Sequence, residues 1–319
     1  MARGRRIGIP LAGLALAVLT ACDFDAAPPV ATPPAAAPPP PPVERPVVEP
    51  GPESRELALY YQRLQNDLLA QGLLRGDGGG PDTAFTDTML ARNFVRIALF
   101  DEYVSDGDFL RPQATLSKLR RWERPVRMAV EFGESVPLAQ RTRDSATVAA
   151  YAARLSRISG LPIATGSADP NFHVLMLNED DRKAAAARIR EIVPGISLGT
   201  LNAMVNLQRT DLCIVVAFAE GNAPSYSKAI AIIRAEHPEL LRTACIHEEL
   251  AQGLGLANDS PQARPSIFND DEEFGLLTTH DELLLRMLYD PRLRAGMAPA
   301  EAAPIARQIA RELMASGPS

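Results

Sequence analysis

The sequence predicts an α+β fold, in which an α/β layer packs on a mixed β-sheet. Segments with helical three- and four-residue spacing of apolar side chains alternate with short apolar runs typical of strands. The 319 residues, of which 46% are hydrophobic and 23% charged, suffice for a sizeable core. The formal net charge of -6 argues against a nucleic-acid-binding protein, which would need a basic surface.

The first 53 residues are expected to lie outside the folded domain. Residues 1–21 combine a positively charged start, a short apolar core and a final Leu-Thr-Ala before Cys22, which resembles the lipobox of bacterial lipoproteins. We interpret residues 1–21 as a lipoprotein signal peptide and Cys22 as the lipid-attachment residue; a plain signal peptide or an uncleaved anchor is the alternative. The Pro- and Ala-rich residues 22–53 favour an extended tether. The resemblance implies lipid anchoring to a bacterial membrane in the cell envelope, with the domain facing the periplasm.

The folded part is predicted to begin with a helix and a glycine-rich loop. Apolar residues at helical spacing predict the helix over residues 54–74, and the loop that follows is rich in glycine. We assign residues 54–82 to this N-terminal region, residues 83–297 to the main globular domain and residues 298–319 to a C-terminal helix.

The main domain is predicted to alternate helices and strands. Helical spacing marks the helices, and alternating or continuous apolar runs mark the strands. In chain order, these are a helix over 86–102, a strand over 124–132, a helix over 145–159, a strand over 172–177, a helix over 180–192, a strand over 212–218 and a helix over 226–236. A last helix, from His237 to about Leu254, is apolar on nearly all sides and should be buried, and Gly255 can end it with a positive φ.

Two cysteines remain once Cys22 is assigned to the lipid. Cys213 lies in a predicted strand and Cys245 in the predicted buried helix. An even pair in an oxidising compartment favours a disulfide. Two separate buried thiols are the alternative, because cysteine is common in apolar surroundings.

The stretch CIHEELAQGLGLAND, residues 245–259, carries the candidate functional residues. At about 100° per residue, Glu248 and Gln252 fall on one face of a helix that is otherwise expected to pack. Buried polar side chains need partners, so this pair predicts a cleft beside the helix.

The same stretch resembles the motif of metzincin-type zincin metallopeptidases, His-Glu-x-x-His-x-x-Gly-x-x-His/Asp, in which the two helical histidines and the last residue bind zinc. In the register that fits best, Glu248, Gln252 and Asn258 stand at the three ligand positions. Glu249 then occupies the position of the general base, and Gly255 that of the turn. The resemblance implies a zincin-like domain.

A register that starts at His247 fits less well, because it places an alanine at the second ligand position and a leucine at the glycine position. Further along the chain, residues 266–268 lie where the methionine turn of these enzymes would be. Residues 276–290, LLTTHDELLLRMLYD, resemble their C-terminal helix, and residues 279–282 have the spacing of a capping box.

A broader resemblance covers residues from about 83 to 297. The stretches LARNFVRIALFDEY, LRRWERPVRMAVEFG, NFHVLMLN, IRAEHPELLRTACIHEELAQGLGLANDSP and ARPSIFNDDEEFGLLTTHDELLLRMLYDPRL are similar to the bacterial lipoprotein family of domain of unknown function 2927. The family resemblance spans most of the mature domain, whereas the zincin resemblance rests on one helix and its turn.

The residues at the ligand positions predict that zinc chemistry has been lost. Gln252 and Asn258 offer neutral amides, which are poor zinc ligands, so only the Glu248 carboxylate suits zinc. A different divalent cation held by oxygens of Glu248, Asn258 and Asp259 is the alternative. The acidic run at residues 270–273 is expected to be a solvated loop, because it lacks the ligand spacing of an EF-hand.

Three functions are compatible with these features. The one we favour is a zinc-free, zincin-like pseudoenzyme whose cleft binds a peptide or another envelope component. The second is an atypical hydrolase or peptidase with Glu249 as general base, alone or with a metal. The third is a structural module on a tether. A membrane, through the lipid, and a peptide or envelope protein are the expected partners, and nucleic acid is not.

Overall fold

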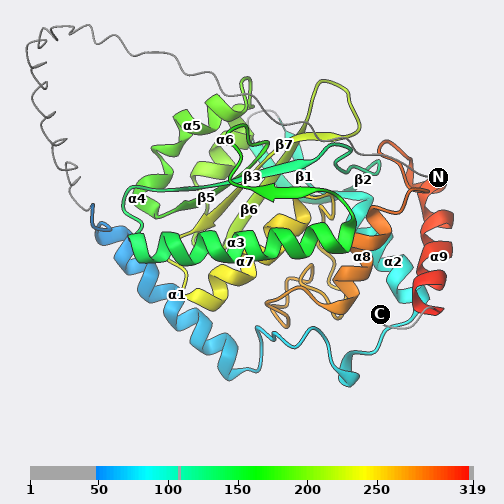
Figure 1. Cartoon of the computed structure of the whole chain (residues 1–319). Helices are drawn as coiled ribbons and strands as arrows, with labels where there is room; N and C mark the ends of the chain where they lie inside the picture. The colour runs from blue at the N-terminus through cyan, green and yellow to red at the C-terminus, as the bar shows by residue number, and fades with distance from the viewer. Residues whose placement is uncertain (1–47, 107–108, 316–319) are drawn as a thin grey trace, which may run out of the picture. The chain divides into compact units, whose positions relative to one another are not determined.

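A five-stranded mixed sheet lies at the centre of the protein (Figure 1), whose computed structural model describes residues 48–106 and 109–315. The strand order is β4-β3-β5-β7-β6. The first four strands in this order run parallel, whereas β6 pairs antiparallel with β7 at the edge. The strands are β3 (Val126–Phe132), β4 (Ile163–Thr165), β5 (Phe172–Leu177), β6 (Cys213–Ala219) and β7 (Tyr226–Arg234). The predicted α+β class with a mixed sheet is confirmed.

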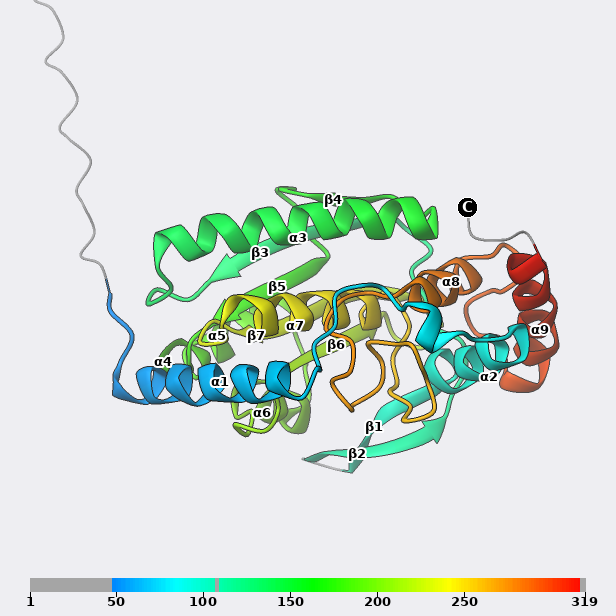
Figure 2. The same cartoon turned by 90° about the horizontal axis from the view of Figure 1, so that it is seen from below.

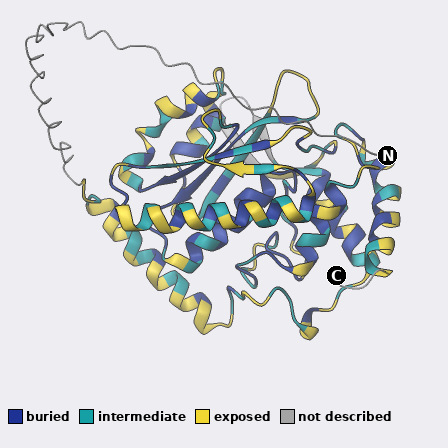
Figure 3. Ribbon diagram, in the orientation of Figure 1, coloured by how far each residue is buried: buried dark blue, intermediate teal, exposed yellow. Residues whose placement is uncertain are grey.

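Alternate residues of β5 face two different cores. Phe172, Val174 and Met176 pack toward α3 (Leu138–Ser159) and α7 (Glu239–Gln252). Leu175 and Leu177 pack with apolar residues of α5 (Ala185–Ile192) and α6 (Leu198–Val205) on the opposite face. Figures 1 and 3 show the helices on both sides of the buried strands. This double burial explains the continuous apolar sequence of β5.

The prediction of a helix over residues 226–236 is wrong, because this segment forms β7. Its residues Ala229–Ile233 have no exposed surface, and they pair with β5 on one side and β6 on the other. The segment contains residues that also favour helices, such as Ala and Lys, but pairing with two neighbours outweighs that local preference. The apolar run suits a central strand, which is covered on both faces.

The helix predicted over residues 86–102 ends sooner than expected. α2 spans Asp87–Ala98 with Thr86 as its N-cap, and the chain then forms β1 (Phe100–Asp106), which pairs antiparallel with β2 (Phe109–Leu116). Phe100 and Tyr103 continue the helical spacing of apolar residues, which hid this hairpin in the sequence. The hairpin lies beyond the β6 edge of the sheet, as Figure 2 shows.

Several smaller differences concern boundaries. The helix predicted over 180–192 is divided into α4 (Glu179–Arg182) and α5, and α6 and β4 were not predicted. The capping box involves Thr278 and Asp281, one residue earlier than predicted. The remaining helices are α1 (Pro52–Ala70), the 3-10 turn η1 (Pro81–Thr83), α8 (Thr279–Leu288) and α9 (Pro299–Ala315).

The helix that carries the candidate residues is buried, as predicted. α7 ends at Gln252, and Gly255 follows with a φ of +128°. A Cβ atom at Gly255 would lie 2.3 Å from the backbone oxygen of Arg120, so the close approach requires glycine. The predicted disulfide between Cys213 and Cys245 is confirmed, with the two Cα atoms 5.9 Å apart.

The proposed signal peptide, the lipid-attachment residue Cys22 and nearly all of the tether lie outside the described residues. Within residues 48–106 and 109–315, no helix has both the length and the apolar character needed to cross a membrane.

Candidate functional site

A pocket of about 300 Å³ lies beside the edge strand β6 and the C-terminal half of α7. Its walls come from β6 with the loop before it, from α7, from β1 and from the long segment between α7 and α8. We call it the acidic pocket, because seven of its lining residues are acidic and its described lining contains no Lys, Arg or His. The acidic residues are Glu102, Asp211, Glu248, Glu249, Asp259, Asp270 and Glu272.

The disulfide sets the position of α7 against β6. Cys213 itself lines the acidic pocket, and Cys245 lies one helical turn before Glu249. Residues four apart lie on the same side of a helix, so the bond between the two sulfur atoms holds Glu249 close to the strand. Glu248, the residue just before it, also lines the pocket.

Hydrogen bonds of Gln252 and Asn258 hold Asp259 at the acidic pocket. The side chain of Gln252 donates a hydrogen bond to its Oδ1 at 3.0 Å. Asn258 ties the segment to α2, because its Nδ2 donates to the backbone oxygen of Arg96 at 2.9 Å and its backbone N–H donates to the backbone oxygen of Ile97 at 3.1 Å. Gln252 and Asn258 therefore position Asp259.

The acidic run at residues 270–273 is divided between ion pairs and the acidic pocket. Glu273 forms ion pairs with Arg75 and Arg264, whereas Asp270 and Glu272 line the acidic pocket. Glu272 has a φ of +57°, and its backbone oxygen accepts a hydrogen bond from the backbone N–H of Leu74 at 2.8 Å. The expectation of a simply solvated loop therefore holds for only part of the run, and a non-glycine residue in the left-handed region lies beside the candidate site.

Burial and mutual repulsion raise the pKa values of the pocket carboxyl groups. Loss of hydration is the main cause of pKa values well above the ordinary range at Glu248, Glu249 and Asp259, and neighbouring carboxylates add to it. For the same reasons, the pKa of Glu272 rises to about 7, and that of Asp270 is raised as well. Part of the pocket is therefore protonated near neutral pH, and a cation entering it would favour the ionised forms.

Glu249 has an unsatisfied oxygen. The residue is 4% exposed, and its Oε2 is buried and has no hydrogen-bond partner among the described residues. Buried polar atoms in native proteins are nearly always paired, so an orphan atom beside a pocket indicates a missing partner. A donor on a bound ligand would supply that partner.

The three predicted ligand positions do not form one set. Glu248 lines the acidic pocket, Gln252 directs its amide to Asp259, and Asn258 lines a neighbouring cavity with its amide donated to backbone oxygens. These donors do not fit a zinc ion. In the part of the chain that the structure describes, no three or more His, Cys, Asp or Glu side chains are placed to hold a metal.

His247 stabilises the fold instead of facing the pocket. Its Nδ1 accepts a hydrogen bond from the backbone N–H of Leu277 at 3.0 Å, and its ring stacks on Tyr151 with centroids 3.9 Å apart. Burial, and then the charge of Arg154, lowers the pKa of His247 to about 3, so it is neutral at physiological pH. His173 and His280 also have partners, Glu131 and Asn93.

Sequence reasoning identified the α7 part of the site and missed the opposite wall. Glu102 lies in a segment that was predicted to be helical, so its position beside α7 had no signal in the sequence. Asp270 and Glu272 belong to a run whose composition is typical of solvated loops. Only the fold brings these residues to Glu248, Glu249 and Asp259.

One of the comparisons with known proteins supports the resemblance to domain of unknown function 2927. No curated protein and no solved structure matches this chain. The model of one family, described as protein of unknown function (DUF2927), matches residues 87–308, a range that contains all of the acidic pocket. The chain therefore belongs to the DUF2927 family.

Proposed function

We propose that this chain is a cell-envelope lipoprotein whose acidic pocket binds an extended peptide segment with basic side chains. The observation that carries the proposal is the location of a cluster of carboxyl groups, including that of the buried Glu249, directly beside a sheet edge. β6 pairs with β7 on one side, and no other described strand pairs with it. An edge strand offers backbone N–H and C=O groups that can pair with an added peptide strand.

The charge of the pocket selects the side chains of the peptide. A peptide that pairs with β6 would present alternate side chains to the pocket. A Lys or Arg side chain there would donate hydrogen bonds to the carboxylates, including the unsatisfied Oε2 of Glu249. Because ionisation of the carboxyl groups favours the cation, affinity is expected to increase as pH rises through their raised pKa values.

The zincin resemblance supports a peptide as the ligand. In the best register, Glu248 and Glu249 stand at the first ligand position and at the general base, and both lie beside the edge strand. We infer a zincin-like cleft that keeps a place for an extended peptide but no zinc ligand set. The lipid anchor rests on the lipobox at Cys22, and it would hold this cleft at a membrane facing the periplasm.

Fluorescence anisotropy of the full chain tests the proposal. A labelled peptide of alternating Lys and Val should bind, and its affinity should fall as salt is added and stay unchanged in EDTA. Glu249→Gln should weaken binding by roughly tenfold, the effect of about 1.4 kcal/mol. Glu134→Gln, which removes an exposed carboxylate elsewhere, is the matched control and should leave affinity unchanged. Equal binding of a Glu-Val peptide would contradict the proposal.

A second function, peptide hydrolysis, is favoured by the state of Glu249. A buried carboxyl with a raised pKa beside a pocket suits a general acid or base. Mass spectrometry after incubation with the Lys-Val peptide and with a mixed peptide library tests this function. Cleavage that is lost in Glu249→Gln would support it, and unchanged peptides after prolonged incubation would exclude it for those substrates.

A further inference from the structure

A second cavity adjoins the acidic pocket. This cavity has a volume of about 190 Å³ and shares Asp259 with the acidic pocket. Its other walls are residues 258–262, Ala114 of β2, and two residues at the end of α2 and the start of β1, Arg96 and Phe100. The second cavity therefore connects the acidic pocket to α2.

Arg96 and Phe100 also line a third and larger cavity. It has a volume of about 810 Å³ and lies between α2 and α9. Asp259 lines both of the first two cavities, and Arg96 and Phe100 line both of the last two, so each cavity is a neighbour of the next.

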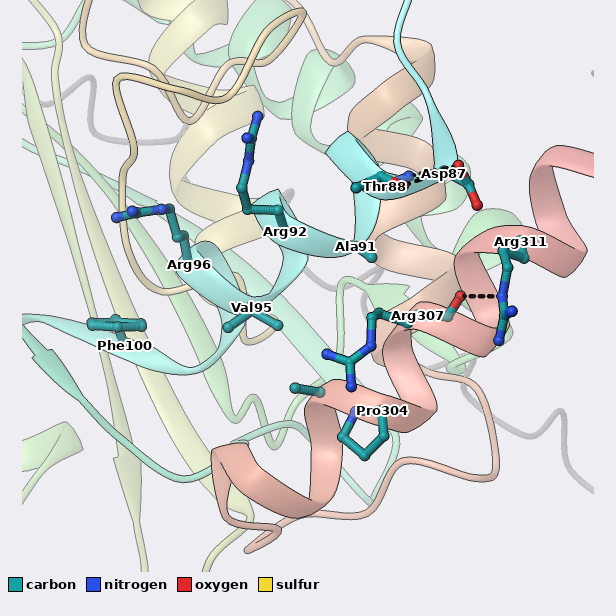
Figure 4. A pocket seen from close by; sticks show the side chains of 11 residues that line it. Asp87, Thr88, Ala91, Arg92, Val95, Arg96, Phe100, Pro304, Arg307 and Arg311 are labelled. Atoms are coloured by element: carbon teal, nitrogen blue, oxygen red, sulfur yellow. Dashed lines mark hydrogen bonds between the residues drawn. The ribbon is translucent and has the colours of Figure 1, made fainter.

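The charge of the third cavity is opposite to that of the acidic pocket. Four arginines line it, and Asp87 is the one acidic residue among its described lining residues, so we call it the basic pocket. Figure 4 shows Arg307 reaching from α9 toward Val95, while the side chains of Arg92 and Arg96 extend from α2 away from α9. Between these side chains, the lining is apolar: Ala91, Val95, Phe100, Ala303 and Pro304.

The spacing of the four arginines destabilises the two helices that carry them. Arg92 and Arg96 are four residues apart on α2, and Arg307 and Arg311 are four residues apart on α9. Like charges at this spacing repel and destabilise a helix by a few tenths of a kcal/mol. All four side chains are exposed, and none of them forms an ion pair with another residue of the described chain. An anionic ligand would remove this repulsion.

We propose that the three cavities form one groove that binds a bipolar peptide, with basic side chains in the acidic pocket and carboxylates at the basic pocket. This inference rests on the proposed function and names the substrate class of the same site. Arginine suits carboxylates because its planar guanidinium can donate two parallel hydrogen bonds. The carboxylates could belong to acidic side chains or to the C-terminus of the peptide.

Binding of matched peptides to the full chain tests the inference. One peptide carries only the Lys-Val segment, and the others add a Gly-Ser spacer of about four, eight or twelve residues and a Glu-containing end. At least one bipolar peptide should bind at least tenfold more tightly than the Lys-Val segment, because its second contact with the protein is intramolecular once the first has formed. Each bipolar peptide is made with an amidated or a free C-terminus, and with Glu or Gln near that terminus. Comparison of these four forms shows whether the Glu side chain or the C-terminal carboxylate contacts the basic pocket.

Substitutions of the arginines test whether the basic pocket causes the higher affinity for the bipolar peptide. In the double variant Arg92→Ala/Arg307→Ala, the affinity for the bipolar peptide should fall to that for the Lys-Val segment. The affinity for the Lys-Val segment itself should be unchanged. Arg143→Ala, which removes an exposed arginine of α3, is the control and should change neither. The double variant should melt no lower than the wild type, because it removes like-charge repulsion.

The possible failures are distinguishable. If the Lys-Val segment binds and no bipolar peptide binds more tightly, the groove is wrong and the proposed function stands. A gain that persists in Arg92→Ala/Arg307→Ala would also overturn the groove. If neither kind of peptide binds, both the groove and the proposed function fail.

Discussion

Cys213 and Cys245 join the edge strand β6 to α7 one helical turn before Glu249. Cys213 is itself a wall of the acidic pocket, so this disulfide is part of the site as well as a crosslink in the fold. It fixes the distance between the backbone edge that would receive a peptide and the carboxyl groups that would select its side chains.

Removal of this disulfide should lower the stability of the folded domain. The sequence separation of 32 residues predicts a loss of about 3–4 kcal/mol in the free energy of unfolding for Cys213→Ala/Cys245→Ala. Chemical denaturation of the oxidised wild type and of the double variant measures this loss. The variant should be insensitive to reductant, which serves as the control. Equal stability of the two proteins would contradict the role assigned to the bond.

Stability should fall as the pH rises from about 6.5 to about 8. The folded-state pKa of Glu272, about 7, lies above its ordinary value, so this side chain holds its proton to a higher pH in the folded protein than in the unfolded chain. By linkage, the free energy of unfolding decreases as pH rises through this window. Glu248, Glu249, Asp259 and Asp270 act in the same direction, because their pKa values are also raised. His237 and His247 act in the opposite direction below about pH 6.5, because burial lowers their pKa values and the unfolded chain then binds more protons.

Thermal unfolding at a series of pH values measures this effect. Because 1 kcal/mol shifts Tm by roughly 2–4 °C in a domain of this size, we expect a decrease of a few degrees. Glu272→Gln should flatten the curve, since it removes one of the titrating groups. A Tm that rises from about pH 6.5 to about pH 8 would show that burial does not disfavour the ionised form of these carboxyl groups.

Gly255 should tolerate substitution poorly. In Gly255→Ala, the new Cβ would meet the backbone oxygen of Arg120, and the backbone would keep a φ of +128° that alanine disfavours. We expect a loss of at least about 2–3 kcal/mol in the free energy of unfolding, which denaturant titration would measure. Gly166→Ala is the matched control, because Gly166 has a φ of +78° and a Cβ added there would meet no atom within 4 Å, so its cost should be about 1 kcal/mol. Equal losses would refute the close approach at Gly255.

His247 should matter for stability and not for binding. His247→Phe keeps the ring that stacks on Tyr151 but leaves the backbone N–H of Leu277 without an acceptor. A buried unpaired donor costs about 1–3 kcal/mol, which denaturant unfolding would detect. The affinity for the Lys-Val peptide should be unchanged. A variant of normal stability that no longer binds peptide would instead place His247 in the site.

The elements predicted correctly are those in which the sequence pattern of apolar residues matches the burial of the element in the fold. β5 was predicted with the correct bounds, because a short apolar run between polar segments is typical of a strand buried on both faces. The helix before it ends at Ser159 as predicted, and Gly160 follows with a φ of +72°. β7 was missed because its apolar run also fits a buried helix, and only pairing with β5 and β6 decides between the two.

The site was predictable in the part that one helix carries. Helical geometry places Glu248 and Gln252 on one face, and the structure shows Glu248 in the pocket and Gln252 supporting Asp259. The contributions of Glu102 and Glu272 depend on the β1–β2 hairpin and on the bond from Leu74, which join segments distant in the sequence. A local sequence pattern does not predict such contacts between distant segments.

Hydrogen–deuterium exchange of β6 with and without the Lys-Val peptide tests the central claim most directly. Pairing of the peptide with the free edge should slow exchange at residues 213–215, which line the acidic pocket, and Glu249→Gln should reduce that protection. Protection confined to another part of the chain, or none at peptide concentrations that saturate binding, would contradict the account.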